Sequence, residues 1–237
     1  MSKSIKAVIF DLDNTLVDFM KMKVDGVQAA VIAMIDAGLK LEPKEAKERI
    51  FNIYREEGIE FQEVFDNFLI EEYGTVNHKI LAAGIVAYRK AREAALVLYP
   101  HVQMTLMELT KRGYRLAVLS DAPLKQAWLR LSYLNLLHIF DQVIGYEDTG
   151  KRKPAPEPFR LALERLGVSA EEAVMVGDWP ERDMKGASNL GITTIYARYG
   201  DTHSSPEEIS RDIIPGTNYI LNDISEILDI LERLKND

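Results

Sequence analysis

Short apolar runs alternate with helical patterns along most of this chain, and this alternation constrains its fold more than any other feature. The first run, residues 5–10, is almost continuously apolar and rich in β-branched residues, which predicts a strand buried on both faces. Similar runs lie at 115–119, 142–145, 173–176 and 193–196, and helical patterns separate them. The alternation predicts an α/β fold with a doubly wound, Rossmann-like parallel sheet.

The stretch from residue 16 to 98 departs from this alternation, because it holds only helical patterns. Apolar residues recur there at helical spacing and predict four helices, around residues 24–35, 43–57, 61–69 and 77–95. We therefore predict two domains. Residues 1–15 and 99–237 form the α/β core, and residues 16–98 form an inserted all-helical domain.

Composition narrows the possible functions. The 237 residues include no cysteine, which excludes disulfides, thiolate zinc sites and cysteine nucleophiles. The formal net charge of −8 argues against a nucleic-acid partner but not against a phosphorylated one. No apolar stretch approaches the roughly 20 residues that span a membrane, and the N-terminus shows no signal peptide. We expect a cytoplasmic protein, and the sequence sets no oligomeric state.

Polar and charged side chains suited to catalysis or binding follow four of the predicted strands. Asp11 and Asp13 follow the first, Ser120 and Asp121 the second, Lys153 the third, and Asp178 and Asp183 the fourth. Each of them alone is typical of a turn or a helix cap. Ligands of open α/β sheets lie outside the carboxyl ends of the strands, so the set as a whole predicts one crevice.

This set resembles the four motifs of the haloacid dehalogenase superfamily of phosphatases. The motifs match as Asp11-Leu12-Asp13-Asn14-Thr15-Leu16, Leu119-Ser120-Asp121, Lys153-Pro154 with the residues after it, and Gly177-Asp178 with Asp183. The resemblance covers the whole chain and implies that the helical insert is a cap over the crevice. The second motif departs from the family, because Ala122-Pro123 follow where a glycine is common, and Pro123 has no N–H to offer a phosphate.

Carboxylates gathered in one crevice repel each other, and a divalent cation relieves that repulsion. Hard oxygen ligands favour magnesium, Mg²⁺. The resemblance implies that Asp11, the backbone carbonyl of Asp13, and Asp178 are the metal ligands. Asp183 would hold a metal-bound water or orient a neighbour.

The resemblance also implies the catalytic roles. Asp11 would be the nucleophile, and Asp13 would protonate the leaving oxygen and later accept a proton from water. Ser120 and the backbone N–H of Asp121 would bind the phosphoryl oxygens. Lys153 would neutralise both those oxygens and Asp11. An acid at position 13 is what favours attack on phosphorus over the carbon chemistry of dehalogenases.

We therefore expect hydrolysis of a small phosphomonoester, such as a sugar phosphate, a triose phosphate or phosphoglycolate. A phosphomutase on a small sugar phosphate is the alternative enzyme, because it shares all four motifs. A non-enzymatic aspartyl-phosphate switch is the alternative from another class. Lys21 and Lys23 are expected to be solvated at a helix start, and Trp179 is expected to pack in the core.

Overall fold

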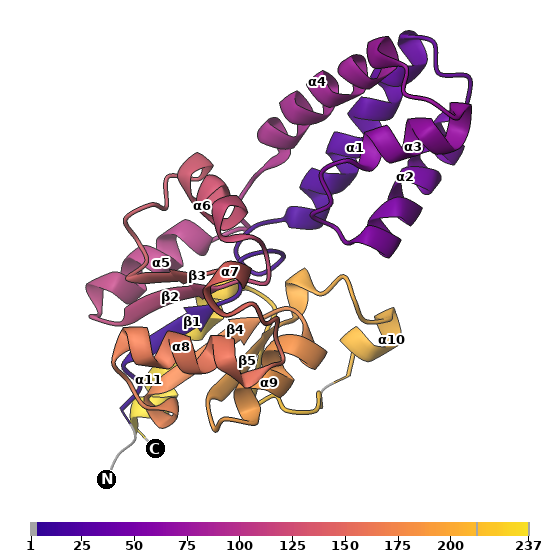
Figure 1. The fold of residues 1–237 in the computed structure, drawn as a ribbon. Helices are drawn as coiled ribbons and strands as arrows, with labels where there is room; N and C mark the ends of the chain where they lie inside the picture. Colours follow the sequence, from indigo (N-terminus) through magenta and orange to yellow (C-terminus); the bar gives the residue numbers. More distant parts are fainter. Residues whose placement is uncertain (1–3, 212, 237) are drawn as a thin grey trace. The chain divides into compact units, whose positions relative to one another are not determined.

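The computed structural model describes residues 4–211 and 213–236, and it divides the chain into two compact units (Figure 1). One unit comprises Met1–Asp18 and Leu98–Asp237, and the other comprises Phe19–Val97. The sequence-based boundaries, after residues 15 and 98, lie within three residues of this division. Among the helices of the described residues, none is long and apolar enough to cross a membrane.

The first unit is built on a parallel sheet, which confirms the predicted fold class. Its described strands follow the order β3-β2-β1-β4-β5-β6, and every neighbouring pair is parallel. The strands are β1 (Ala7–Phe10), β2 (Arg115–Leu119), β3 (Gln142–Ile144), β4 (Ala173–Gly177), β5 (Thr193–Ala197) and β6 (Tyr219–Leu221). The sequence did not predict β6, because three residues with only Leu221 buried form no recognisable pattern.

Helices cover both faces of this sheet (Figure 1). The helices of this unit are α5 (Val102–Lys111), α6 (Leu124–Tyr133), α7 (Tyr146–Thr149), α8 (Pro156–Leu166), α9 (Lys185–Ser188), α10 (Pro206–Ile209) and α11 (Ile227–Asn236), with the short helix η2 at Pro180–Met184. Ala7 and Ile9 pack in one core cluster with Phe159 of α8. The alternate side chains of the same strand, Val8 and Phe10, are equally buried, as a sheet with two covered faces requires.

The second unit contains the four predicted helices. They are α1 (Phe19–Asp36), α2 (Pro43–Glu57), α3 (Val64–Tyr73) and α4 (His78–Ala95). A Cβ added to Gly26 would come within 2.8 Å of the Tyr88 ring, and one added to Gly84 would come within 2.1 Å of Met34. Glycines therefore allow α1 and α4 to approach closely. The role of this unit as a cap stays a prediction.

The two lysines near the start of α1 differ in their surroundings. Lys21 is exposed and forms an ion pair with Asp25. Lys23 is buried, with its Nζ 4.3 Å from the centre of the Tyr54 ring and 5.8 Å from that of Tyr88. The expectation of a solvated Lys23 was therefore wrong. The aromatic partners come from α2 and α4, which local sequence around residue 23 does not reveal.

Candidate active site

The register of the sheet places the end of β1 between the ends of two other strands. Phe10 of β1 is opposite Val118 of β2 on one side and Val176 of β4 on the other. The backbone N–H of Asp11 donates to the carbonyl of Val176 at 2.8 Å, so the pairing with β4 continues to Asp11. The residues that follow β2 and β4 therefore flank Asp11 directly.

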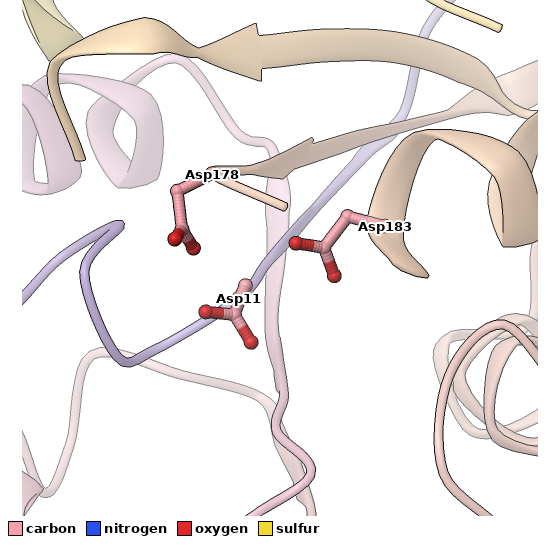
Figure 2. A group of neighbouring side chains, drawn as sticks. All are labelled: Asp11, Asp178 and Asp183. Carbon is pink, nitrogen blue, oxygen red and sulfur yellow. The ribbon is translucent and has the colours of Figure 1, made fainter. Parts of the chain in front are cut away.

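Three aspartates form the centre of this site. Carboxylate oxygens of Asp11, Asp178 and Asp183 lie within 4.8 Å of one another, and all three residues are buried. Figure 2 shows the carboxylates of these aspartates turned toward a common region. Thr15 Oγ1 donates to Asp178 Oδ1 at 3.1 Å, and the backbone N–H of Trp179 donates to Asp183 Oδ2 at 3.1 Å. These hydrogen bonds fix the orientation of two of the three carboxylates.

A buried lysine joins the three aspartates. Lys153 Nζ lies 2.5 Å from Asp11 Oδ1 and 2.6 Å from Asp183 Oδ1. The same ammonium donates to the carbonyl of Leu119 at 3.0 Å, at the end of β2. The predicted nucleophile and the predicted lysine are thus in direct contact, although 142 residues separate them.

The electrostatics of this group leave it short of positive charge. Burial raises the pKa of Asp11 to about 8, with Asp183 and Asp13 adding to the rise and Lys153 opposing it. Burial, and then Asp11 and Asp183, raise the pKa of Asp178 well above its ordinary value. Burial would lower the pKa of Lys153, but Asp11 and Asp183 raise it, so Lys153 stays charged. One ammonium faces three carboxylates, and an added cation would relieve the imbalance.

The residues present fit a divalent cation. Within the described part of the chain, Asp178 Oδ2 is buried and has no hydrogen-bond partner. The nearest cationic candidate, His203 Nε2, lies 3.8 Å from this oxygen, and burial lowers the pKa of His203. Carboxylate oxygens of this kind are hard ligands that suit magnesium or calcium. Asp183, predicted to lie behind the ligands, sits within the same group as Asp11 and Asp178.

The second motif lies beside Asp11 and is tied to the other loops. Ser120 is buried, and its Oγ accepts from the backbone N–H of Ala122 at 3.1 Å. The carboxylate of Asp121 accepts from the backbone N–H of Lys153 at 2.9 Å and from Arg182 Nη1 at 2.8 Å. The side chain of Asp121 thus links these loops to each other. The group of Asp121 that is predicted to bind phosphate is its backbone N–H, not this side chain.

Two features of the site were not predicted from the sequence. Trp179 was expected to pack in the core, but it is only partly buried. Its ring stacks on His203 with ring centres 3.5 Å apart and lies 3.8 Å from the Arg182 guanidinium. Asp13 is bound by Arg130 of α6, whose Nη1 donates to Asp13 Oδ2 at 2.9 Å. The available signal for Arg130 was its place among the apolar positions of the helix after residue 124.

Comparison with known proteins gives consistent results. A family model described as a haloacid dehalogenase-like hydrolase matches residues 5–191. A glyceraldehyde 3-phosphate phosphatase of Methanocaldococcus jannaschii is 35% identical, over 98% of this chain and 100% of its own. A phosphoglycolate phosphatase of Aquifex aeolicus is 30% identical, over 83% of this chain and 86% of its own. A crystal structure of a HAD phosphatase from Thermococcus onnurineus superposes with a TM-score of 0.68 at 26% identity, covering 96% and 98% of the two chains.

The family model spans most of the chain and includes all four motif positions, from Asp11 to Asp183. The first of these relatives is matched along its whole length, so the similarity extends over the helical unit as well as the sheet. These relatives confirm the predicted enzyme class, a phosphatase that hydrolyses phosphoric monoesters. The chain belongs to the haloacid dehalogenase-like hydrolase family.

Proposed function

We propose that this chain is a magnesium-dependent phosphatase that hydrolyses a small phosphomonoester through a phosphoaspartate formed on Asp11. The observation that carries the proposal is the buried group of three carboxylates in which Asp11 contacts Lys153 at 2.5 Å. A carboxylate at the edge of a parallel sheet, beside a fixed ammonium and a cation site, is suited to attack phosphorus.

In the first half-reaction, a carboxylate oxygen of Asp11 attacks phosphorus. The new bond joins Asp11 to the phosphoryl group, and the bond from phosphorus to the substrate's leaving oxygen breaks. Asp13 gives its proton to that oxygen, so the product leaves as a neutral alcohol. Lys153 and the Ser120 hydroxyl bind the phosphoryl oxygens, whose charge they stabilise throughout.

In the second half-reaction, water attacks the phosphorus of the phosphoaspartate. Asp13, now ionised, takes a proton from the water, and the bond between phosphorus and Asp11 breaks. Inorganic phosphate leaves, and both aspartates return to their starting states. Asp13 thus needs a position from which it reaches the leaving oxygen first and the attacking water second.

Asp11 must be ionised in order to attack. Its pKa of about 8 without metal would leave much of it protonated at neutral pH. A bound magnesium ion would supply positive charge that favours the ionised carboxylates and draws the substrate phosphate to Asp11. Asp11, the backbone carbonyl of Asp13, and Asp178 are the proposed ligands, with Asp183 behind them.

The proposed substrate is glyceraldehyde 3-phosphate. The support is a relative named for that activity, which aligns with 98% of this chain over its own whole length. Phosphoglycolate is the second candidate, since a relative named for it aligns over 83% of the chain. Both molecules are small alkyl phosphates, so their leaving oxygens are poor leaving groups and need the proton that Asp13 is proposed to give.

The test is phosphate release from a panel that includes both substrates, with magnesium and with a chelator. Wild type, Asp11→Asn and the matched control Asp229→Asn, an exposed aspartate on α11, are compared. We expect magnesium-dependent release by wild type and the control, and none by Asp11→Asn. Full activity of Asp11→Asn would refute the nucleophile. Conversion of a sugar phosphate to its isomer without phosphate release would favour the phosphomutase, and a phosphoaspartate stable for minutes would favour the switch.

A further inference from the structure

Arg130 is a charged residue on the buried face of α6. It is 6% exposed, and it shares this face with Ala127 and Leu131. An arginine is almost never buried without a partner, because removing its charge from water is unfavourable unless a counter-charge offsets it. The position of Arg130 therefore requires an explanation from its contacts.

One partner of Arg130 is the residue proposed to transfer protons. Arg130 Nη1 lies 2.9 Å from Asp13 Oδ2, and the side chain of Arg130 is 7% exposed, compared with 20% for that of Asp13. The pair joins segments 117 residues apart in the sequence. Arg130 lies on the buried face of its helix, whereas the side chain of Asp13 is more exposed, although its Oδ1 is buried and its Oδ2 accepts from Arg130.

Asp13 lies outside the group of three central carboxylates. Asp11 is only two residues away, and it gathers with Asp178 and Asp183 within 4.8 Å, a group that does not include Asp13. An aspartate side chain has few rotamers, and a cation held by that group would attract any carboxylate free to turn toward it. The guanidinium of Arg130 binds Asp13 from a different element, α6, which begins at Leu124 just after the second motif.

We infer that Arg130 is a positioning residue that holds the Asp13 carboxylate where it can give a proton to the leaving oxygen. The inference rests on the proposed phosphatase mechanism. A general acid must lie within roughly 2.6–3.2 Å of its target, and a displacement of about 1 Å can reduce the rate about 100-fold. The guanidinium by itself favours the ionised carboxylate, so Arg130 helps proton donation only through the position that it gives Asp13. Loss of that position should impair leaving-group protonation more than substrate binding.

Leaving groups of different acidity distinguish this role from a structural one. The aryl ester p-nitrophenyl phosphate releases a stable phenolate and needs little protonation, whereas an alkyl ester such as glyceraldehyde 3-phosphate needs much. The ratio kcat/KM includes only the steps up to departure of the leaving group, so hydrolysis of the phosphoaspartate does not affect it. A loss confined to the alkyl ester reports on proton donation.

The experiment measures kcat/KM on both esters for wild type, Arg130→Met and Arg130→Lys. We expect Arg130→Met to lose about 10- to 100-fold on the alkyl ester and only a few-fold on the aryl ester. Arg130→Lys should restore part of the loss, because a lysine keeps a positive charge and an N–H donor at this position. The matched control is Arg165→Met, which removes an arginine–aspartate pair between α8 and α7, and we expect no selective effect.

A second background tests whether Arg130 acts through Asp13. In Asp13→Asn, the change Arg130→Met should add no more than about two-fold, because contributions that act through one group are not additive. Equal losses on the two esters, or an undiminished loss in the Asp13→Asn background, would overturn the inference. If Arg130→Met does not fold, Arg130→Lys decides, and an unselective loss there also overturns it. Wild type that hydrolyses neither ester would instead refute the proposed function.

Discussion

The metal-free protein should lose stability as the pH rises from about 4 to about 8. Asp11 has an ordinary pKa of 3.8 in the unfolded chain, and burial raises it to about 8 in the folded protein. Between these values the unfolded chain releases the proton while the folded protein keeps it. Rising pH therefore favours unfolding, and the stabilisation present below pH 4 is lost as the pH passes through the folded pKa.

The contribution of Asp11 alone follows from one proton. Asp11 should cost up to about 1.4 kcal/mol of the free energy of unfolding per pH unit, or about 2–3 kcal/mol from pH 5 to 7, and Asp178, whose pKa is also raised, should add to this loss. Saturating magnesium should flatten this slope, because the cation binds the ionised carboxylates. Magnesium should thus stabilise the protein more at pH 8 than at pH 5.

Denaturant unfolding followed by tryptophan fluorescence measures this effect. The chain has two tryptophans, Trp128 and Trp179, and both lie in the unit that contains the site, so the signal reports that unit. Asp11→Asn removes the titrating carboxyl group. In chelator, the free energy of unfolding of this variant should fall with pH less steeply than that of wild type, by about 1 kcal/mol per pH unit. Parallel slopes for wild type and Asp11→Asn, or a magnesium effect that does not grow with pH, would refute the reasoning.

Two further substitutions test the site and the helical unit separately. Gly177→Ala places a Cβ 2.4 Å from the Asp183 carboxylate, so it should displace Asp183 and weaken magnesium binding by about 10- to 100-fold in calorimetric titration. Unchanged magnesium affinity would show that magnesium binding does not depend on the present position of Asp183. Phe68→Ala empties a fully buried position of the helical unit and should cost about 3–5 kcal/mol there, seen as faster hydrogen exchange over residues 19–97. Unchanged protection of these amides would contradict the packing.

Much of the fold follows from local pattern in the sequence. The strand β2 and the helix α2 begin and end where the sequence predicts, because a buried strand and an amphipathic helix leave different apolar periods. The helical pattern between strands β4 and β5 does not form one regular helix, since Pro180–Met184 forms a π-helix and α9 covers only Lys185–Ser188. Short elements such as β6 carry too few residues to show a period.

The sequence by itself determined the chemistry available at the strand ends, because Asp11, Ser120, Lys153 and Asp178 each follow a predicted strand. The tertiary structure alone decided how these groups meet, since parallel register aligns the end of β1 with those of β2 and β4. It also decided the pairing of Arg130 with Asp13. That contact depends on where α6 packs, and packing between distant segments has no local signal in the sequence.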